Sequence, residues 1–226
     1  MLSFASNYGI IIALAIICAG RAVSEANKPL RGIRRGQSQD ARNIQKGLQS
    51  IREVQTMELN KIIRDIPDFP QKGVLFRDIT PLLHNPQALR ETVDQMCQVL
   101  SQFEFDYVVG PESRGFIFGV PVAYAMNKGF IPIRKKGKLP YETLSREYSL
   151  EYGTAVLEMH ADAIRPGQKV VIVDDLIATG GTSKAIVELI EEAGGQVVNL
   201  MYLIELVQLG GREMLKGYDV KTLIQY

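Results

Sequence analysis

The chain has 226 residues, of which 46% are hydrophobic and 23% are charged, and its formal net charge is +1. This length suits one domain of ordinary size with an appendage, and it supplies enough apolar residues for a full core. A net charge near zero gives no overall attraction to nucleic acid, so we expect no nucleic-acid partner. An anionic ligand would need a local cluster of cations.

The first 56 residues differ from the rest of the chain. Residues 10–20, IIIALAIICAG, form an apolar run shorter than the roughly 20 residues that span a bilayer. No basic residue precedes the run and no clean A-x-A site follows it, unlike in a signal peptide. We therefore expect residues 1–56 to be a dispensable extension without membrane contact, and residues 57–226 to be the folded domain of a cytoplasmic protein. An anchor through residues 10–20 is the alternative.

Two helices are predicted in the first part of the domain. Residues 59–66 carry leucine and isoleucine at helical spacing, which predicts a helix that ends at Pro67. Asn85 and Pro86 form a typical N-cap and first-turn pair, and they predict the start of a longer helix. Its apolar face would carry Leu89, Val93, Met96, Leu100 and Phe103.

Apolar strands alternate with helices in the rest of the chain. Strands are predicted at 106–110, 130–135, 169–175, 196–206 and 221–226, and helices at 115–128 and from about 182 to Gly194. Continuous apolar strands that alternate with helices predict an α/β fold, with a parallel sheet covered on both faces. Ligands of such sheets bind at the carboxyl ends of the strands.

The segment 170–190, VVIVDDLIATGGTSKAIVELI, carries the main functional signal. Asp174 and Asp175 lie at the end of a buried strand, where carboxylates can accept hydrogen bonds from paired hydroxyl groups. Small residues and closely spaced N–H groups at a helix start then form a typical anion cradle, here Ala178, Thr179, Gly180, Gly181 and Thr182. A diol acceptor beside a phosphate cradle fits a ribose phosphate. A strand–turn–helix with glycines for packing alone is the alternative.

This segment resembles the phosphoribosyl-diphosphate motif of type I phosphoribosyltransferases. Four further segments resemble adenine phosphoribosyltransferases in the same order and spacing: DFPQKGVLFRDITPLL (68–83), ESRGFIFG (112–119), IRKKGKLP (133–140) and SLEYG (149–153). The resemblance runs from about residue 57 to residue 226 and leaves the extension unmatched. It implies the type I phosphoribosyltransferase fold, a central and mainly parallel sheet flanked by helices, with a flexible lid loop.

The resemblance also implies a reaction. Adenine and 5-phosphoribosyl 1-diphosphate would give AMP and diphosphate, in a homodimer. The Mg²⁺ cofactor would be held through the substrate diphosphate and not directly by protein ligands. The motif residues 174, 175 and 178–182 would bind the ribose and phosphate groups of the sugar diphosphate and of AMP.

The family implies a cationic site for the leaving diphosphate. Its ligands would be Ser113, Arg114, Arg134, Lys135 and Lys138, with Arg114 also catalytic. The family commonly has a non-proline cis peptide near Glu112–Ser113 in this loop. Without the resemblance, Arg114 is a surface cation and residues 134–138 are a solvated basic loop.

The segment 73–78 matches the family's base-binding segment. Leu75 and Arg77 would bind adenine through their main-chain groups, Phe76 would lie against the ring, and Leu176 would pack on its other side. Simple core packing is the alternative role of Phe76, and pairing with Asp78 is the alternative role of Arg77.

The transfer also needs a group that manages the purine proton. Relatives that act on 6-oxopurines carry an acidic residue where this chain has Ala178, which argues for adenine. Glu151 matches the carboxylate of the adenine family and would act at adenine N7. It lies in the polar segment 140–153, expected to be a lid that Tyr152 helps to close. Three further carboxylates in or just after this segment are expected to be solvated: Glu142, Glu147 and Glu158.

A second class of function uses the same domain. Purine-responsive repressors bind the sugar diphosphate without chemistry, but they need a DNA-binding domain. Residues 1–56 have too little apolar periodicity for such a domain, and the net charge is only +1. We therefore expect the enzyme.

Overall fold

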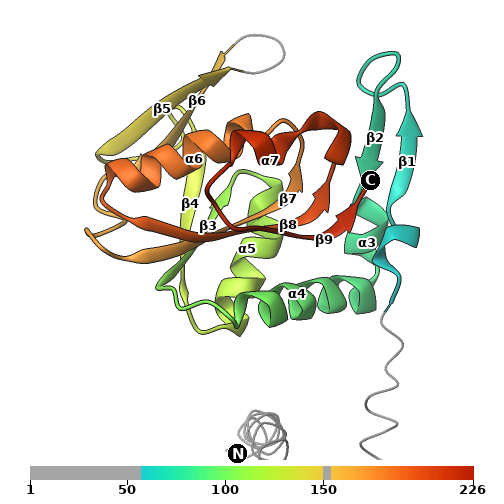
Figure 1. Cartoon of the computed structure of the whole chain (residues 1–226), viewed down its shortest axis with the longest axis horizontal. Coiled ribbons are helices and arrows are strands. Elements are labelled where there is room, and N and C mark those ends of the chain that lie inside the picture. The colour runs from blue at the N-terminus through green and yellow to red at the C-terminus, as the bar shows by residue number, and fades with distance from the viewer. Residues whose placement is uncertain (1–56, 150–153) are drawn as a thin grey trace, which may run out of the picture. The chain divides into compact units, whose positions relative to one another are not determined.

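The computed structural model describes residues 57–149 and 154–226. Its main sheet has the strand order β5-β6-β4-β3-β7-β8-β9, and a separate hairpin pairs β1 with β2 (Figure 1). The strands are β1 Arg64–Pro67, β2 Leu75–Asp78, β3 Tyr107–Pro111, β4 Gly129–Lys135, β5 Thr143–Ser149, β6 Thr154–His160, β7 Lys169–Ile177, β8 Gln196–Glu205 and β9 Val220–Gln225. The helices are η1 Leu59–Lys61, α3 Thr80–His84, α4 Pro86–Leu100, α5 Arg114–Ala125, α6 Gly181–Glu192, η2 Val207–Leu209 and α7 Gly211–Met214.

The centre of the main sheet is parallel, as predicted. Strand β3 pairs in parallel with β4 and β7, and β8 pairs in parallel with β7 and β9. Strands β5 and β6 add an antiparallel edge beyond β4. Helices α4 and α5 lie on one side of this sheet, and α6 and α7 lie on the other (Figure 1). The prediction of an α/β fold is confirmed.

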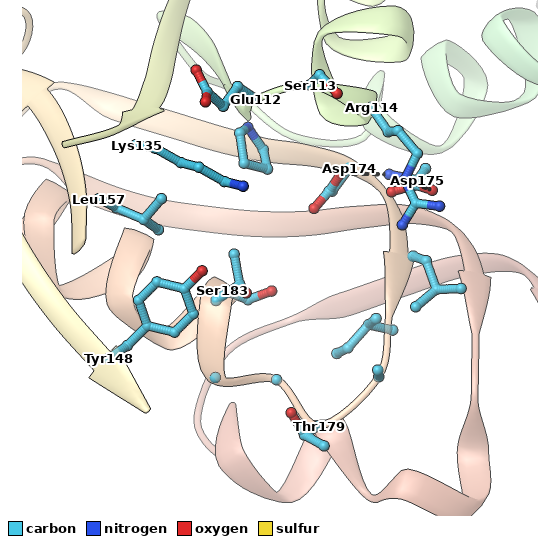
Figure 2. Close-up of a pocket in the computed structure, with 17 residues that line it drawn as sticks. Glu112, Ser113, Arg114, Lys135, Tyr148, Leu157, Asp174, Asp175, Thr179 and Ser183 are labelled. Carbon is cyan, nitrogen blue, oxygen red and sulfur yellow. Dashed lines mark hydrogen bonds and ion pairs between the residues drawn. The ribbon is translucent and has the colours of Figure 1, made fainter. Parts of the chain in front are cut away.

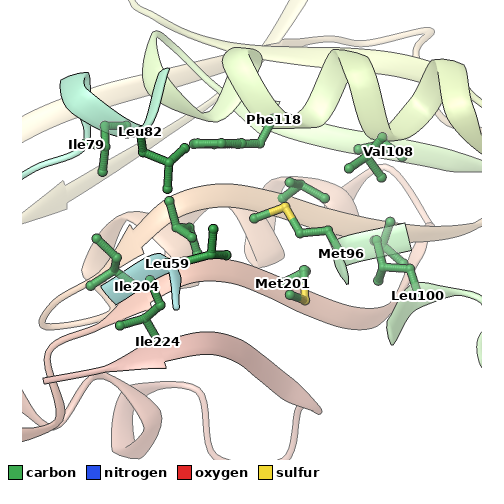
Figure 3. Packing of buried hydrophobic residues seen from close by; sticks show 14 of the residues in the cluster. Leu59, Ile79, Leu82, Met96, Leu100, Val108, Phe118, Met201, Ile204 and Ile224 are labelled. Carbon is green, nitrogen blue, oxygen red and sulfur yellow. The ribbon is translucent and has the colours of Figure 1, made fainter. Parts of the chain in front are cut away.

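Two hydrophobic clusters bury the two faces of the sheet. Val171 and Val173 of β7 pack with Met96 of α4 and Phe118 of α5 in the first cluster, part of which Figure 3 shows. Alternate residues of the same strand, including Ile172, belong to the second cluster under α6. Because side chains alternate along a strand, a strand buried on both faces is apolar at nearly every position. The carboxyl end of β7 is therefore held from both sides.

The predicted start of α4 is also confirmed. The Asn85 side chain accepts hydrogen bonds from the N–H groups of Gln87 and Ala88, at 3.0 and 3.1 Å. This N-cap satisfies two donors that the first helical turn leaves without an intrahelical partner.

The helix predicted over residues 59–66 is wrong. Only Leu59–Lys61 form a short 3-10 turn, and Arg64–Pro67 form strand β1. Strand β1 pairs with β2 in an antiparallel register that places Ile66 opposite Phe76. The antiparallel backbone pairing with β2 overrides the helical spacing of a few apolar residues.

The expected lid segment is also more ordered than a loop over part of its length. Residues 143–149 form β5, which pairs along its length with β6, a strand that the sequence did not predict. Leu144 and Tyr148 pack against the second cluster, but Arg146 lies between them, so this polar segment carries no clear apolar alternation. Residues 150–153, including Glu151 and Tyr152, lie outside the described residues.

The extension also lies outside the described residues, so the boundary at residue 57 stays a prediction. Within residues 57–149 and 154–226, no helix is long and apolar enough to cross a membrane. The apolar run 10–20 is not part of that finding.

Gly119 offers a test of the packing between α5 and the sheet. A Cβ atom at this position would lie 2.6 Å from Cε2 of the Phe130 ring, which also packs against Gly110. Alanine favours helices over glycine by about 1 kcal/mol, but overpacking costs about 1–3 kcal/mol. We expect Gly119→Ala to lower the free energy of unfolding by about 1 kcal/mol, as measured by chemical denaturation. Val120→Ala, at an exposed position of the same helix, is the control and should change little; a stabilised Gly119→Ala would contradict this packing.

Candidate active site

A pocket of about 450 Å³ lies where β3 and β7 end and α6 begins (Figure 2). It brings together most of the predicted sugar-diphosphate residues, Ser113, Arg114, Lys135, Asp174, Asp175, Ala178, Thr179, Gly180, Gly181 and Thr182, and also Leu176, which was predicted to contact adenine. Its lining also includes residues to which no binding role was assigned from the sequence: Pro111, Glu112, Tyr148, Leu157, Ile177 and Ser183. The position agrees with the expectation that ligands bind at the carboxyl ends of parallel strands.

Two adjacent carboxylates of β7 face this pocket (Figure 2). The Asp175 N–H donates to Oδ1 of Asp174 at 2.8 Å, and Asp175 Oδ2 lies 3.0 Å from Nε of Arg114. Burial raises the pKa of Asp174 well above its usual value, and the neighbouring Asp175 charge raises it further. Burial also raises the pKa of Asp175, although the Arg114 guanidinium opposes that shift. The pair is therefore costly to bury, as expected for groups kept for a ligand.

The loop between β7 and α6 has the conformation of an anion cradle. Gly180 has a φ of +84°, which favours glycine, and it precedes the first turn of α6. A Cβ atom on Gly180 would lie 2.6 Å from the Gly211 carbonyl oxygen, and one on Gly211 would lie 2.4 Å from the Ala178 carbonyl oxygen. The loop therefore rests directly on the start of α7, with no room for a side chain between them.

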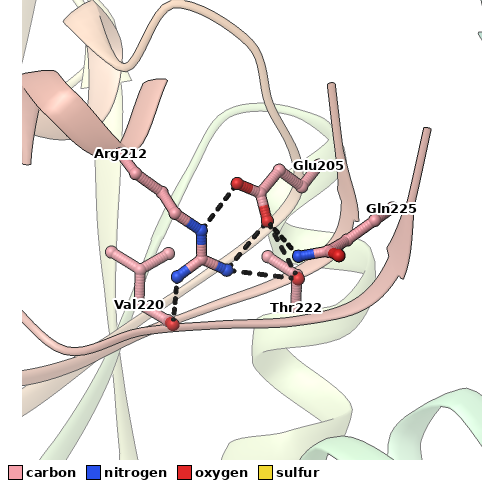
Figure 4. A network of polar contacts seen from close by, with 5 residues as sticks. All are labelled: Glu205, Arg212, Val220, Thr222 and Gln225. Carbon is pink, nitrogen blue, oxygen red and sulfur yellow. Dashed lines mark hydrogen bonds and ion pairs between the residues drawn. The ribbon is translucent and has the colours of Figure 1, made fainter. Parts of the chain in front are cut away.

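A network of polar contacts fixes α7 in this place (Figure 4). Arg212 donates from Nε and Nη2 to the two carboxylate oxygens of Glu205, at 2.6 and 2.8 Å. It also donates to the Val220 carbonyl at 2.8 Å, while Gln225 donates to Glu205 at 3.0 Å. The hydrogen bonds from Arg212 lower the pKa of the nearly buried Glu205. The network joins α7 to β8 and β9. Because the cradle loop rests on α7, the network also holds that loop in place.

The loop after β3 carries the predicted diphosphate residues. The peptide bond between Glu112 and Ser113 is cis, as the family resemblance predicted. Arg134 does not line the pocket: its Nε donates to Glu112 at 2.6 Å and its Nη1 to the Lys138 carbonyl at 3.2 Å. Lys138 does not line the pocket either, so the roles of Arg134 and Lys138 stay predictions.

Of the four predicted adenine residues, Phe76 lines a neighbouring cavity, also of about 450 Å³, and Leu75 and Arg77 line neither this cavity nor the pocket. The Phe76 ring meets the Phe69 ring edge to face with the centroids 5.1 Å apart. Arg114 lines this cavity as well as the pocket, with its guanidinium carbon 5.9 Å from the Phe76 centroid. Leu75 is 45% exposed on the hairpin, whereas Leu176 lines the first pocket.

Arg77 is occupied by other groups, and not by Asp78. It forms an ion pair with Asp65 on the paired strand, and its guanidinium carbon lies 3.7 Å from the centroid of the Tyr226 ring. Asp78 instead lies 3.5 Å from Arg64. The Arg77 side chain is therefore engaged in contacts with Asp65 and Tyr226, which is compatible with a role for Arg77 through its backbone.

The carboxylates that were expected to be solvated differ in their exposure. Glu142 and Glu147 are exposed, as predicted. The prediction of a solvated Glu158 is wrong: it is only 7% exposed and accepts a hydrogen bond from the Gly137 N–H at 2.9 Å. Glu158 is buried because β6 lies next to the turn at residues 135–138. Since β6 was not predicted from the sequence, this burial could not be predicted either.

Two residues of the pocket lacked a clear sequence signal. Ser183 directly follows the cradle motif, and Tyr148 precedes SLEYG; the hydroxyl of Tyr148 points into the pocket from β5 (Figure 2). Their proximity to motif residues was the available signal. Only the arrangement of β5, β8 and α6 shows that the hydroxyl groups of Tyr148 and Ser183 lie at the pocket.

Comparisons with known proteins agree with this site. A family model described as "phosphoribosyl transferase domain" matches residues 78–224. The adenine phosphoribosyltransferase of Lachnoclostridium phytofermentans is 60% identical over 169 residues, which cover 75% of this chain and 97% of that protein.

Solved structures give the same result. The adenine phosphoribosyltransferase of Thermoanaerobacter pseudethanolicus superimposes with a TM-score of 0.74 at 51% identity, over 76% of this chain and 99% of that one. The enzyme of Saccharomyces cerevisiae, complexed with adenine and an imino-altritol bisphosphate, gives 0.70 at 39% identity, over 74% and 97%. The chain belongs to the phosphoribosyltransferase family, and its relatives within that family are adenine phosphoribosyltransferases.

The raised pKa of Asp174 predicts a stability that depends on pH. Because the folded state disfavours the ionised form of Asp174, the raised pKa costs stability at neutral pH, and this cost diminishes as the pH falls through the pKa of the folded state. We expect Asp174→Asn to raise the thermal unfolding midpoint of the ligand-free protein at neutral pH by about 2–4 °C, corresponding to about 1 kcal/mol. This gain in the unfolding midpoint should shrink in acid. The Asp174→Asn variant should also lose nucleotide formation.

Asp94→Asn, at an exposed position of α4, is the matched control and should show no such gain. A neutral-pH midpoint of Asp174→Asn at or below that of the unchanged protein would contradict the cost assigned to this carboxylate.

Proposed function

We propose that the chain is an adenine phosphoribosyltransferase, which forms AMP and diphosphate from adenine and 5-phosphoribosyl 1-diphosphate. The observation that carries this proposal is the Asp174–Asp175 pair beside the glycine cradle in one pocket. The similarity to adenine phosphoribosyltransferases over nearly their full length supports the same activity.

The pocket offers complementary groups for each part of the sugar diphosphate. Asp174 and Asp175 would accept hydrogen bonds from the two ribose hydroxyls. The N–H groups of residues 178–182, at the start of α6, would donate to the 5-phosphate, aided by the helix dipole. The threonine hydroxyls at 179 and 182 add two further donors.

Cations at the opposite wall would stabilise the leaving diphosphate. Arg114 and Lys135 line the pocket together with Ser113, and Arg134 and Lys138 lie nearby on the next strand and turn. Cleavage of the glycosidic bond leaves an oxocarbenium-like sugar and a concentrated anion, so charges held in place before the reaction lower its barrier. The side chain of Arg114 would act on the reacting groups directly.

We infer that Mg²⁺ is the cofactor of this reaction. Among residues 57–149 and 154–226, no group of three or more His, Cys, Asp or Glu side chains could hold a metal alone. The ion would be held by the oxygens of the substrate diphosphate, which are the hard ligands that Mg²⁺ prefers, and not directly by protein ligands. When bound, the ion would neutralise diphosphate charge.

The neighbouring cavity would receive adenine. Its walls include Phe69 and Phe76, and Arg114 connects it with the phosphate pocket. Main-chain groups of Leu75 and Arg77 would recognise the base edge, and Leu176 would pack from the side of the pocket. The complex of the yeast relative with adenine supports binding of this base.

Proton management would fall to Glu151, in the segment that follows β5. Tyr148, three positions before Glu151 in the sequence, lines the pocket, and this supports the assignment. Ala178 leaves no carboxylate at the position that 6-oxopurine enzymes use. We also infer a homodimer, a cytoplasmic location and a dispensable role for residues 1–56.

A purine panel tests the base assignment. The full chain receives 5-phosphoribosyl 1-diphosphate, Mg²⁺ and, separately, adenine, hypoxanthine, guanine or xanthine, with nucleotides separated by chromatography. We expect product from adenine alone. Glu151→Gln should lower kcat by about 100-fold or more, the contribution of a general acid or base.

Glu147→Gln, an exposed carboxylate of β5, is the matched control and should retain activity. Product from an oxopurine would overturn the argument from Ala178. Binding of the sugar diphosphate without any product would instead favour the repressor-type sensor.

Removal of divalent cations tests the role of Mg²⁺. A chelator should lower the rate of AMP formation by about 100-fold or more, because the diphosphate charge is no longer neutralised. Excess MgCl₂ should restore the rate, and chelator already saturated with Mg²⁺ should have no effect. An unchanged rate in the chelated protein would rule out this cofactor.

A further inference from the structure

A pair of buried hydroxyl groups lies beneath the phosphate cradle. The Tyr202 hydroxyl of β8 donates to Oγ of Ser183 at 2.7 Å. Tyr202 is fully buried, and Ser183 is only 5% exposed. Ser183 is the third residue of α6 and lines the pocket that holds the cradle (Figure 2).

The surroundings decide which of the two hydroxyls donates. Tyr202 lies within the second hydrophobic cluster, and Ser183 is its one hydrogen-bond partner in the described part of the chain. If Ser183 donated instead, the Tyr202 hydrogen would be left in apolar surroundings without an acceptor, which is costly. Tyr202 therefore donates, and burial raises the pKa of its hydroxyl, so it keeps its proton.

The direction of this bond leaves the Ser183 hydrogen free. A hydroxyl group has one hydrogen and can accept with its lone pairs at the same time. The Tyr202 hydrogen occupies a lone pair of Oγ on the side of the sheet. The Ser183 hydroxyl is not a donor to any residue that the structure describes, and the space open to it is the pocket.

We propose that Ser183 is a further ligand of the phosphate group on ribose C5, and that Tyr202 is the positioning residue that directs its hydroxyl hydrogen. This inference rests on the proposed function. The hydroxyl would add a donor to the N–H groups and threonine hydroxyls of the cradle. A hydrogen bond to a charged phosphate oxygen is stronger than one between neutral groups.

The binding of AMP and of adenosine to the full chain tests the proposal, because the two differ only in that phosphate. Measured by calorimetric titration, Ser183→Ala should raise the Kd for AMP about tenfold and leave that for adenosine unchanged. Tyr202→Phe should raise the Kd for AMP about threefold, because Ser183 keeps its hydrogen but loses its orientation. The double variant should bind AMP like Ser183→Ala alone.

Ser101→Ala, an exposed serine at the end of α4, is the matched control and should bind both ligands normally. Equal AMP affinity in Ser183→Ala and the unchanged protein would overturn the proposal, as would an equal loss for AMP and adenosine. Thermal unfolding of each variant shows whether it is folded; if Tyr202→Phe is not, Ser183→Ala still decides the ligand role.

The failure of this inference differs from a failure of the proposed function. If the unchanged protein forms AMP from adenine while Ser183→Ala binds AMP normally, only the role of Ser183 is lost. If no AMP forms but Ser183→Ala still weakens AMP binding selectively, the phosphate ligand stands and the reaction assignment falls.

Discussion

The ion pair between Arg114 and Asp175 is the contact on which the rest of the site depends. Of the two neighbouring carboxylates near the end of β7, Asp175 is buried and Asp174 is half-buried, and Arg114 lies 3.0 Å from Asp175. An uncompensated buried charge is strongly destabilising, so β7 must be held firmly for the pair to persist. The two hydrophobic clusters on the faces of the sheet provide that support. The core and the binding site are thus parts of one arrangement.

The phosphate cradle depends on close backbone contact and not on side chains. Gly180 and Gly211 bring the loop and α7 closer together than any other residues would allow. The Arg212–Glu205 network then fixes α7 to β8 and β9, the last two strands in the sheet order. Preorganised N–H donors need no rearrangement when a phosphate arrives, which is the energetic benefit of a rigid loop.

The sequence predicted the parts of this protein whose signals are local. The apolar runs of β3 and β7, the Asn85 cap and the carboxylate–glycine motif are each contained within a few residues, and each was confirmed in place. The β1–β2 hairpin and the β5–β6 hairpin were missed, because their short strands are stabilised by pairing with the next strand and carry no long apolar run. Glu158 was assigned to solvent for the same reason, since its burial depends on the turn after β4. Ser183 and Tyr202 are 19 residues apart, and only the fold brings them together.

Arg114 lines both the phosphate pocket and the aromatic cavity, and it is the one residue shared by the described linings of the two. Its guanidinium is paired with Asp175 and also lies near the Phe76 ring. Sequence changes in the hairpin could thus alter the choice of base while the sugar site stays intact, and changes in the cradle could do the reverse. A change at Arg114 would disturb both at once. This position therefore limits how independently the two halves of the site can diverge in evolution or be redesigned.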